Sequence, residues 1–306
     1  MTYDVDAVDM KYLDFSDRAL LARVYRPRGE GPFPLMVEVH GGAWCLDDRL
    51  HNASANEALA AQGIVVAAID FRMPPVATYP GSIADVNYAI RWFKTRAAEF
   101  GSRPEFVGVV GSSSGGHQAM LVAMRPRDPR YSSHRLPAGS SEVDATVLCV
   151  VMCWPVIDPL GRYWYVKSLV PGGNPELESR RLVPNLPDAG GARPSLTFSQ
   201  VIDCHERYWV TEESMAEGNP TMALERGENA TLPPALYIQG DMDVAHPRPH
   251  LDRFVTAYRA AGGQVDLCIV EGESGNFILK DPSSAASQKA ISAIGDFVQA
   301  SAAHCG

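Results

Sequence analysis

Short β-rich apolar runs alternate with segments of helical periodicity along most of this sequence, and this alternation constrains the fold more than any other feature. Buried strands are predicted at Pro34–His40, Ile64–Asp70, Phe106–Val110, Val143–Trp154, Ala235–Gln239 and Val265–Val270. Helices are predicted from about Ala53 to Gly63, around Ile83–Phe93, after the Gly/Ser-rich turn at Gly111 into Met124, around Leu251–Ala261 and from Ser284 onward. Such alternation implies right-handed crossovers, so the sequence predicts an α/β fold with a mostly parallel sheet covered on both faces.

Two regions depart from this alternation. The first two runs, Val8–Phe15 and Leu20–Tyr25, follow each other too closely for a crossover, so we expect an antiparallel edge. Between Pro155 and Pro233 the pattern dissolves into a stretch rich in glycine, proline and aromatic residues, too long for a simple connection. We therefore expect a single domain, residues 1–306, with residues 155–233 inserted as a partly helical cap over the carboxyl edge of the sheet.

The composition limits the classes of function. The formal net charge of −9 argues against wrapping nucleic acid or docking on an anionic membrane, because both need clustered Lys and Arg. We find no apolar run of about 18 residues that would span a bilayer, and the acidic N-terminus lacks the order of a secretory signal. The cysteines are scattered, and no grouping of His, Asp and Glu has metal-ligand spacing. We therefore expect a cytoplasmic protein with reduced thiols and neither metal nor cofactor.

A Gly-x-Ser-x-Gly motif at Gly111–Gly115 directly follows a predicted strand and precedes a predicted helix. Small residues let the chain turn tightly there, so that the hydroxyl of the middle serine, Ser113, stands at the helix N-terminus. Backbone N–H groups and the helix dipole at that end stabilise developing negative charge. The pattern indicates Ser113 as a nucleophile, and the alternative is a purely structural Gly/Ser turn.

A second motif, His40–Trp44, ends an earlier buried strand and carries two consecutive glycines. Glycines let the backbone approach a ligand closely and direct N–H groups toward it. The amides of Gly41 and Gly42, together with that of Ser114, are therefore candidates for an oxyanion hole. Alone, the motif is equally typical of an ordinary turn at the end of a strand.

Four segments stand in an order that is familiar: His40–Trp44, Asp70–Pro74, Gly111–His117 and Gly240–Asp243. With them the sequence resembles the α/β-hydrolases, most closely the branch of hormone-sensitive-lipase-like carboxylesterases, feruloyl-esterase-like proteins and kynurenine formamidases. The resemblance covers most of the chain outside the inserted segment. It implies the α/β-hydrolase fold.

The resemblance also implies roles for residues. Ser113 matches the nucleophile, and Gly41, Gly42 and Ser114 match the donors of oxyanion amides. Asp243 matches the triad acid that orients a histidine, with Asp241 as its competitor. The implied activity is hydrolysis of a small carboxylic ester through an acyl-enzyme, with a formamidase or amidase as an alternative. A homodimer is also compatible with this branch.

The catalytic base does not lie where the resemblance predicts it. In the segment after the last strand, Glu271–Phe277, the family's histidine position falls on Gly275, or on Ser274 if the loop is shifted by one residue. There is no histidine between His250 and His304. The sequence therefore departs from the family at the residue that activates the nucleophile.

Three explanations remain open. First, His246, three residues after Asp243, serves as the base, with His250 one turn beyond it. Second, the base has been lost, and the protein is a non-hydrolytic ligand binder or a lyase-like enzyme that uses the oxyanion hole. Third, a residue of the cap such as His205 reaches down to Ser113. The distance from the Ser113 hydroxyl to the nearest histidine nitrogen decides among them.

Aromatic and basic residues in the inserted segment suggest a substrate pocket. Together with one residue beside the oxyanion loop, the candidates for its wall are Trp44, Trp164, Tyr165 and His205. The alternative is that these residues only pack the cap onto the core. Arg162 and Arg207 lie among them and hint at an acidic substrate.

Overall fold

The computed structural model describes residues 2–140, 142–170 and 196–305. Its centre is one eight-stranded sheet with the order β1-β2-β4-β3-β5-β6-β7-β8. The strands are β1 (Val5–Asp14), β2 (Ala19–Pro27), β3 (Leu35–Val39), β4 (Val65–Ile69), β5 (Val107–Ser112), β6 (Val150–Cys153), β7 (Ala235–Gly240) and β8 (Val265–Val270). The predicted α/β fold is confirmed.

The sheet is antiparallel at one edge and parallel elsewhere. β1 pairs with β2 and β2 with β4 in antiparallel fashion, which confirms the predicted edge. From β4 through β3, β5, β6 and β7 to β8 every pairing is parallel. The carboxyl ends of these parallel strands therefore meet at one edge of the sheet, where ligands bind in open α/β folds.

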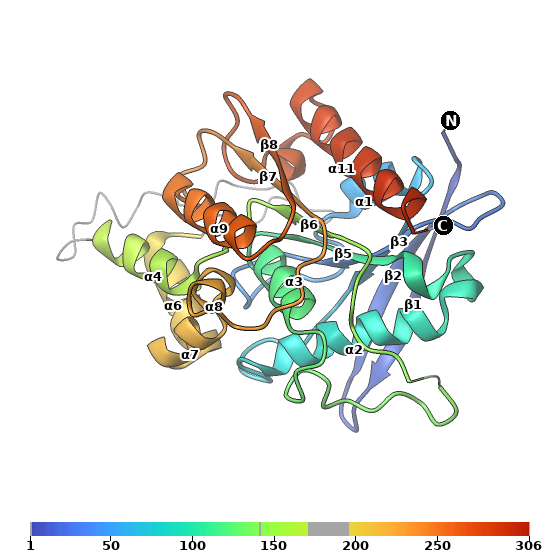
Figure 1. The fold of residues 1–306 in the computed structure, drawn as a ribbon, viewed down its shortest axis with the longest axis horizontal. Coiled ribbons are helices and arrows are strands. Elements are labelled where there is room, and N and C mark those ends of the chain that lie inside the picture. The colour runs from blue at the N-terminus through green and yellow to red at the C-terminus, as the bar shows by residue number, and fades with distance from the viewer. Residues whose placement is uncertain (1, 141, 171–195, 306) are drawn as a thin grey trace.

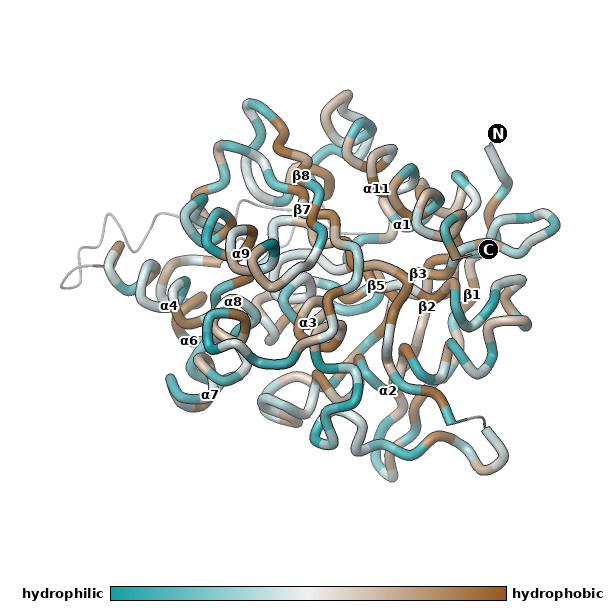
Figure 2. Tube along the Cα trace, in the orientation of Figure 1, coloured by the Kyte–Doolittle hydropathy of each residue, from teal (hydrophilic) through white to brown (hydrophobic). Residues whose placement is uncertain are grey.

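The central strands are buried on both faces. All residues of β3, β4, β5, β6 and β7 are buried, whereas β8 at the edge exposes Asp266 and Leu267. Figure 2 accordingly shows hydrophobic segments along the strands at the centre of the molecule. Near-continuous apolar runs of this kind are the sequence signature of strands covered on both faces.

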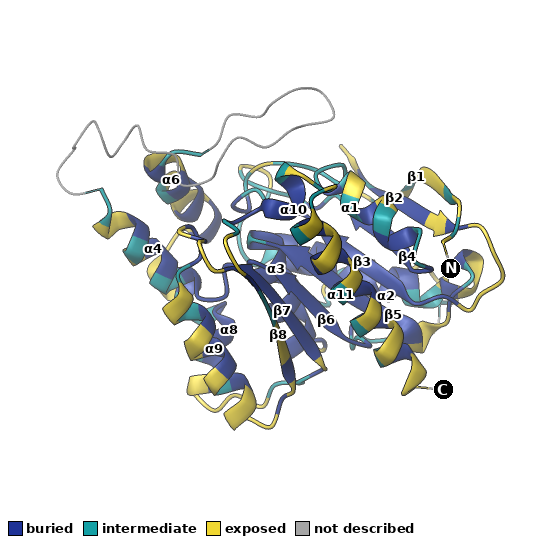
Figure 3. Cartoon of the chain, turned by 90° about the horizontal axis from the view of Figure 1, so that it is seen from above, coloured by how far each residue is buried: buried dark blue, intermediate teal, exposed yellow. Residues whose placement is uncertain are grey.

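Helices cover both faces of the sheet (Figures 1 and 3). The helices of the core are α1 (Ala53–Ala60), α2 (Gly81–Thr95), α3 (Ser114–Met124), α9 (Arg248–Ala260), α10 (Phe277–Lys280) and α11 (Ala285–Ala303). One apolar cluster joins residues of α1, α10 and α11 to the sheet, and a larger one joins α2, α3 and α9 to it. Short 3₁₀ turns, Ala97–Phe100 and Pro104–Phe106, lead into β5.

One predicted strand is much shorter than expected. Val143–Trp154 was predicted as a single strand, but only Val150–Cys153 pairs in the sheet. Before it, the ammonium group of Lys94 donates to the carbonyl oxygens of Asp144 and Thr146. Those backbone carbonyls are therefore satisfied by a side chain rather than by a neighbouring strand, and the segment stays irregular despite its β-branched residues.

The inserted segment, 155–233, is helical in much of its described part. It contains α4 (Pro159–Ser168), α6 (Phe198–Trp209), α7 (Glu212–Glu217) and α8 (Pro220–Glu225). The first three gather at the end of the molecule opposite the β1–β2 hairpin (Figures 1 and 3). Gly172-Gly173 and Gly190-Gly191, used in the prediction of this segment, lie outside the described residues.

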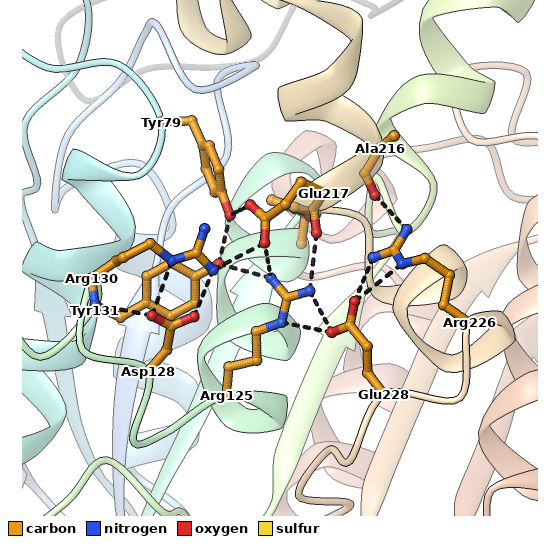
Figure 4. Close-up of polar contacts among 11 residues, drawn as sticks. Tyr79, Arg125, Asp128, Arg130, Tyr131, Ala216, Glu217, Arg226 and Glu228 are labelled. Atoms are coloured by element: carbon orange, nitrogen blue, oxygen red, sulfur yellow. Dashed lines mark hydrogen bonds and ion pairs between the residues drawn. The ribbon is translucent and has the colours of Figure 1, made fainter.

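A polar network fastens the far end of the insertion to the core (Figure 4). Arg125, directly after α3, donates to the carboxylates of Glu217 at 2.7 Å and Glu228 at 2.6 Å. The hydroxyl of Tyr79 donates to the other oxygen of Glu217 at 2.5 Å. Arg130 adds a further bond to Glu217 at 2.9 Å. Because Glu217 ends α7, these contacts fix that helix against the core of the domain.

No helix in the described part of the chain is long and apolar enough to cross a membrane.

Candidate active site

Ser113 occupies the sharp turn between β5 and α3. Its backbone has φ 50° and ψ −118°, a strained conformation for a residue with a side chain. The turn is possible because Gly115 lies against the end of β3: a Cβ on Gly115 would lie 2.0 Å from the carbonyl oxygen of Val39 and 2.3 Å from that of His40. The motif's glycine therefore lets the helix start touch the neighbouring strand, and Ser113 stays half-buried at the tip.

The two-glycine loop after β3 lies beside this serine. A Cβ on Gly41 would lie 3.4 Å from the Cβ of Ser113. Gly42 has φ 92°, a value that favours glycine, and its carbonyl accepts the amides of Cys45 and Leu46. The amide of Trp44 donates to the hydroxyl of Ser114 at 3.1 Å. The structure thus places the two-glycine loop against the serine turn, with Gly41 beside Ser113 and Trp44 bonded to Ser114.

A histidine is in contact with the serine hydroxyl. Nε2 of His246 lies 3.1 Å from Oγ of Ser113, and Nδ1 of the same ring lies 2.9 Å from Oδ2 of Asp243. A carboxylate only accepts hydrogen bonds, so Nδ1 carries the proton and Nε2 offers its lone pair to the serine hydroxyl. The structure therefore brings Ser113, His246 and Asp243 together in one relay, and the acid and base are three residues apart.

The turn after β7 makes this short spacing possible. The other carboxylate oxygen of Asp243, Oδ1, accepts the amides of Ala245 at 2.8 Å and of His246 at 3.1 Å. One carboxylate thus caps the turn and also orients the ring of His246. Burial works to raise the pKa of Asp243, but the charge and hydrogen bonds of His246 and the turn amides outweigh it, so this pKa lies below its ordinary value.

Side chains from outside the turn hold its carbonyl groups. Tyr165 donates to the carbonyl of Val244 at 3.0 Å, and Arg162 donates to that of Ala245 at 3.0 Å. Gln239 of β7 donates to the carbonyl of His246 at 2.5 Å. Sequence reasoning missed these three roles, because nothing in the local pattern shows that α4 lies against this turn.

The family's histidine position lies against the acid. A Cβ on Gly275 would lie 2.8 Å from Oδ1 of Asp243. The carboxylate of Asp243 therefore occupies the space that a side chain at position 275 would need. The hydroxyl of Ser274 accepts a hydrogen bond from Lys280. The contact of the Ser113 hydroxyl with an imidazole is made by His246, not by a residue of this loop.

The other candidate histidines point elsewhere. Nδ1 of His205 bonds the carbonyl of Val201 in its own helix, and the His205 ring lies 4.9 Å from the Trp44 ring. The ring of His250 lies 6.5 Å from that of Tyr165. Burial lowers the pKa of His205 to about 3, so its imidazole is neutral at physiological pH.

The aromatic residues predicted to wall a pocket divide into two groups. Trp44 and His205 have no accessible surface, and Trp44 stacks on Tyr208 within a buried cluster. Their burial favours the alternative that these two residues pack the inserted segment onto the core. Trp164 is 49% exposed and lies beside Lys167. Tyr165 is half-buried and bonds the carbonyl of Val244.

The two arginines that hinted at an acidic substrate also differ. Arg162 is buried against the 243–246 turn, whereas Arg207 is largely exposed and pairs with Asp203 at 3.6 Å. His117, next to the serine turn, is a hydrogen-bonded buried residue, accepting from Trp44 Nε1 at 3.2 Å and donating to the carbonyl of Gly218 at 2.8 Å.

A buried carboxyl group beneath the serine turn was not predicted. Glu38 of β3 accepts from Asn52 at 2.6 Å, and the same Asn52 side chain donates to the hydroxyl of Ser112 at 3.2 Å. Burial raises the pKa of Glu38 to about 7, against the hydrogen bonds of Asn52 and Asn56. The sequence could have indicated this buried carboxyl group, because Glu38 is the one charged residue inside the apolar run Pro-Leu-Met-Val-Glu-Val-His.

Within residues 2–140, 142–170 and 196–305 there is no group of three His, Cys, Asp or Glu residues arranged to hold a metal ion.

Comparison with known proteins connects this site to a family. The profile of the BD-FAE family matches residues 23–163, a region that contains Gly41 and Ser113 but ends before Asp243. Among curated proteins, the esterase LipC of Mycobacterium tuberculosis is 31% identical over 270 residues, which are 87% of this chain and 59% of LipC. The carboxylic ester hydrolase LipM of the same organism is 34% identical over 129 residues, 42% of this chain and 29% of LipM. The chain thus spans less than two thirds of the length of these relatives.

Solved structures share the fold. An esterase of Pyrobaculum calidifontis superimposes with a TM-score of 0.73 at 21% identity, covering 99% of this chain and 86% of that one. Esterase LipW of Mycobacterium marinum gives a TM-score of 0.70 at 20% identity, covering 97% and 82%. The serine turn, the two-glycine loop and these matches lead to one assignment. The chain has the α/β-hydrolase fold, and its sequence is similar to the BD-FAE family over residues 23–163 and to curated esterases over up to 87% of its length.

Proposed function

We propose that this protein is a serine hydrolase that cleaves small carboxylic esters through an acyl-enzyme on Ser113. The observation that carries the proposal is the relay from Ser113 to His246 at 3.1 Å and from His246 to Asp243 at 2.9 Å. A weak nucleophile next to a base that a third group orients is the general signature of nucleophilic catalysis. The named esterases among its relatives support the same class of substrate.

The proposed reaction begins with proton transfer from the Ser113 hydroxyl to Nε2 of His246 while the serine oxygen attacks the ester carbonyl. Asp243 then stabilises the imidazolium through Nδ1. The amides of Gly41, Gly42 and Ser114 are the proposed donors to the tetrahedral oxyanion. His246 next protonates the departing alcohol, which leaves an acyl group on Ser113. Water, deprotonated by the same imidazole, releases the carboxylic acid and restores the free enzyme.

The inserted segment, 155–233, is proposed to act as the cap of this single domain. Support comes from contacts after two strands of the parallel part of the sheet: Trp44 after β3 stacks on Tyr208 of α6, and the carbonyl of Ala245 after β7 accepts from Arg162 of α4. Helices at the carboxyl edge of the sheet restrict which esters reach Ser113.

The rival proposal of a non-hydrolytic binder rests on the loss of the base, since Ser274 and Gly275 stand at the family's histidine position. Because His246 contacts Ser113, the empty family position no longer requires that the base has been lost, and this argues against the rival proposal. A formamidase or amidase would use the same groups, and no contact in the described residues favours a nitrogen leaving group.

The test compares the purified protein with its Ser113→Ala variant on p-nitrophenyl acetate and butyrate. The proposal predicts turnover in the wild type at least about 10³-fold above the variant, since loss of a triad member leaves only the oxyanion hole and binding. A fluorophosphonate probe should label the wild type on Ser113 and leave Ser113→Ala unlabelled. Equal rates and no labelling would mean that the protein is not a serine hydrolase.

A further inference from the structure

Three consecutive carbonyl groups of the turn that carries acid and base are each held by a side chain from outside the turn. Two of these side chains, Arg162 and Tyr165, come from α4 of the inserted segment, and they bond the carbonyls of Ala245 and Val244. We propose that Arg162 is a positioning residue for catalysis: with Tyr165 it clamps the 243–246 turn so that His246 meets Ser113. This inference rests on the proposed function of the same site.

The two donors act as a unit because of their spacing on the helix. Arg162 and Tyr165 are three residues apart in α4, so their side chains lie on the same face. Each bond is 3.0 Å long, and the two acceptors are neighbouring carbonyls of the turn. The helix therefore contacts the turn at two successive peptide groups, which fixes both its position and its rotation.

The helix that supplies these donors is itself firmly held at its start. Asp158 caps α4 by accepting the amide of Gly161 at 2.8 Å. The same carboxylate accepts from Asn219 at 2.6 Å and from Arg253 of α9 at 2.6 Å. Because α8 begins after Asn219, the start of α4 is tied to two further helices. The clamp thus acts from a fixed support.

The environment of Arg162 argues against a role in stability alone. Its side chain is 2% exposed, and its Nη1 atom has no hydrogen-bond partner within the part of the chain that the structure describes. A buried charge stabilises a fold only when it is well paired, and apolar side chains of similar size often serve as well. Burial lowers the pKa of Arg162 to about 10, with the nearby charge of Asp243 acting in the opposite direction. The guanidinium therefore stays charged next to the triad acid.

The turn needs such support because it carries two catalytic groups, the buried side chains of Asp243 and His246, between residues that are exposed. Met242 and Val244, on either side of Asp243, are each 63% exposed, and the apolar packing of the turn comes from the small side chain of Ala245, in a cluster with Val166 and Val201. When acid and base lie in separate loops, each loop is anchored by its own strand. Here a displacement of one turn moves Asp243 and His246 together relative to Ser113, and an error of about 1 Å is enough to cost about 10²-fold in rate.

The experiment measures kcat and KM for p-nitrophenyl acetate in the full-length protein and three variants. Arg162→Met should lower kcat by about 10- to 100-fold, the effect of losing one hydrogen bond from a charged donor, while KM changes less than about threefold. Arg162→Lys should recover at least about fivefold of that loss, because the ammonium group still reaches toward the turn. Tyr165→Phe should lower kcat by about fivefold.

The matched control is Arg125→Met. Arg125 also joins the inserted segment to the core with a largely buried guanidinium. It pairs with Glu217 and Glu228, at the end of the insertion away from the 243–246 turn (Figure 4). This variant should lose thermal stability and keep the wild-type kcat at 25 °C. A merely structural role for Arg162 predicts that both arginine variants lose stability and neither loses kcat.

The outcomes separate this inference from the proposed function. If the wild type has no esterase activity above Ser113→Ala, the proposed function fails first. If the wild type is active and Arg162→Met keeps its kcat within about twofold, the clamp is wrong and the triad stands. If Arg162→Met does not fold, as judged by circular dichroism, Arg162→Lys and Tyr165→Phe decide: wild-type kcat in both overturns the clamp, and a several-fold loss in Tyr165→Phe supports it.

Discussion

The serine turn and the acid–base turn lie at the same edge of the sheet, but they are held in place in different ways. The serine turn is set by its immediate sequence, because Gly115 lets the chain touch β3 and Ser113 follows directly from β5. The 243–246 turn contains only four residues and is held by side chains that come from β7 and α4. One half of the site is local and the other is assembled from distant segments.

This difference explains how the site tolerates a missing family residue. The serine half has little freedom, since its strained backbone must be compensated by close packing. The acid–base half is required only to bring an imidazole to the serine oxygen and a carboxylate to the imidazole. In this chain one turn supplies both groups, and Gly275 leaves the space for the carboxylate.

The largest effect on kcat is expected for Asp243→Asn, which changes the 243–246 turn, the half of the site that distant segments hold in place. Oδ1 of Asp243 accepts two amides and Oδ2 accepts the imidazole, so an amide group cannot satisfy all three donors in either orientation. We expect kcat to fall by about 10⁴-fold, as when a triad acid no longer fixes the imidazole tautomer. Steady-state assays on p-nitrophenyl acetate check this. A loss below about tenfold would mean that Asp243 only caps the turn; Asp241→Asn is the control and should stay near wild type.

Gly115→Ala tests the serine turn, the half of the site that its immediate sequence sets. The new Cβ would lie 2.0 Å from the carbonyl of Val39, a backbone atom of a central strand that has no room to move. We expect a loss of about 3–5 kcal/mol in the free energy of unfolding, comparable to severe overpacking, measured by urea denaturation. Gly41→Ala is the comparison for stability, because its nearest contact is at 3.3 Å. Similar stability of both variants would contradict the close approach at Gly115.

Glu38→Gln examines the support below the serine turn through its pH dependence. The pKa of Glu38 is raised by burial to about 7 in the folded state from 4.5, so folding favours the protonated form. This stability is fully present below about pH 4.5 and is lost as the pH rises toward 7, on the order of 3 kcal/mol. In melting curves from pH 5 to pH 8, Glu38→Gln should lack this decline. An unchanged decline in the variant would assign it to other groups.

The smallest effect is expected for Gly275→His, and its sign shows whether the serine already has a base. Gly275→His restores the histidine that the family pattern predicts, and if the base were simply absent it would raise activity. Here its Cβ would come within 2.8 Å of Asp243, so we expect it to displace the carboxylate and lower kcat by about 10- to 100-fold. Ser274→His, one residue away from the carboxylate contact, should lower kcat less. A gain in turnover with Gly275→His would show that the serine lacks an effective base.

Much of the fold was predictable from the sequence because its signals are local. Apolar runs such as Leu35–Val39 and Val65–Ile69 are strands buried on both faces, and the serine motif predicts its own turn. The strand predicted at Val143–Trp154 was too long, because Lys94, about fifty residues away, satisfies carbonyls that a pairing strand would otherwise need. Intrinsic β-propensity has no information about such a partner.

The candidate site could be predicted only where its residues follow directly from a strand. The positions of Ser113 and Asp243 follow from their places after β5 and β7, but the choice of His246 as partner depends on how tightly one turn closes. The contacts of Arg162 and Trp44 join segments that are 70 or more residues apart in the sequence. Their residue types suggested contact with a substrate, whereas their surroundings make Arg162 part of the proposed clamp and Trp44 a buried residue. Long-range packing of this kind leaves no periodicity in a single sequence.

The central claim is that His246 is the catalytic base, and the most direct measurement is kcat/KM of His246→Ala for p-nitrophenyl acetate. The account predicts a loss of at least about 10³-fold, similar to that of Ser113→Ala, with His250→Ala as the control retaining activity within a few-fold. The rate of fluorophosphonate labelling at Ser113 should fall in parallel. Turnover and labelling of His246→Ala within about tenfold of the wild type would contradict the account.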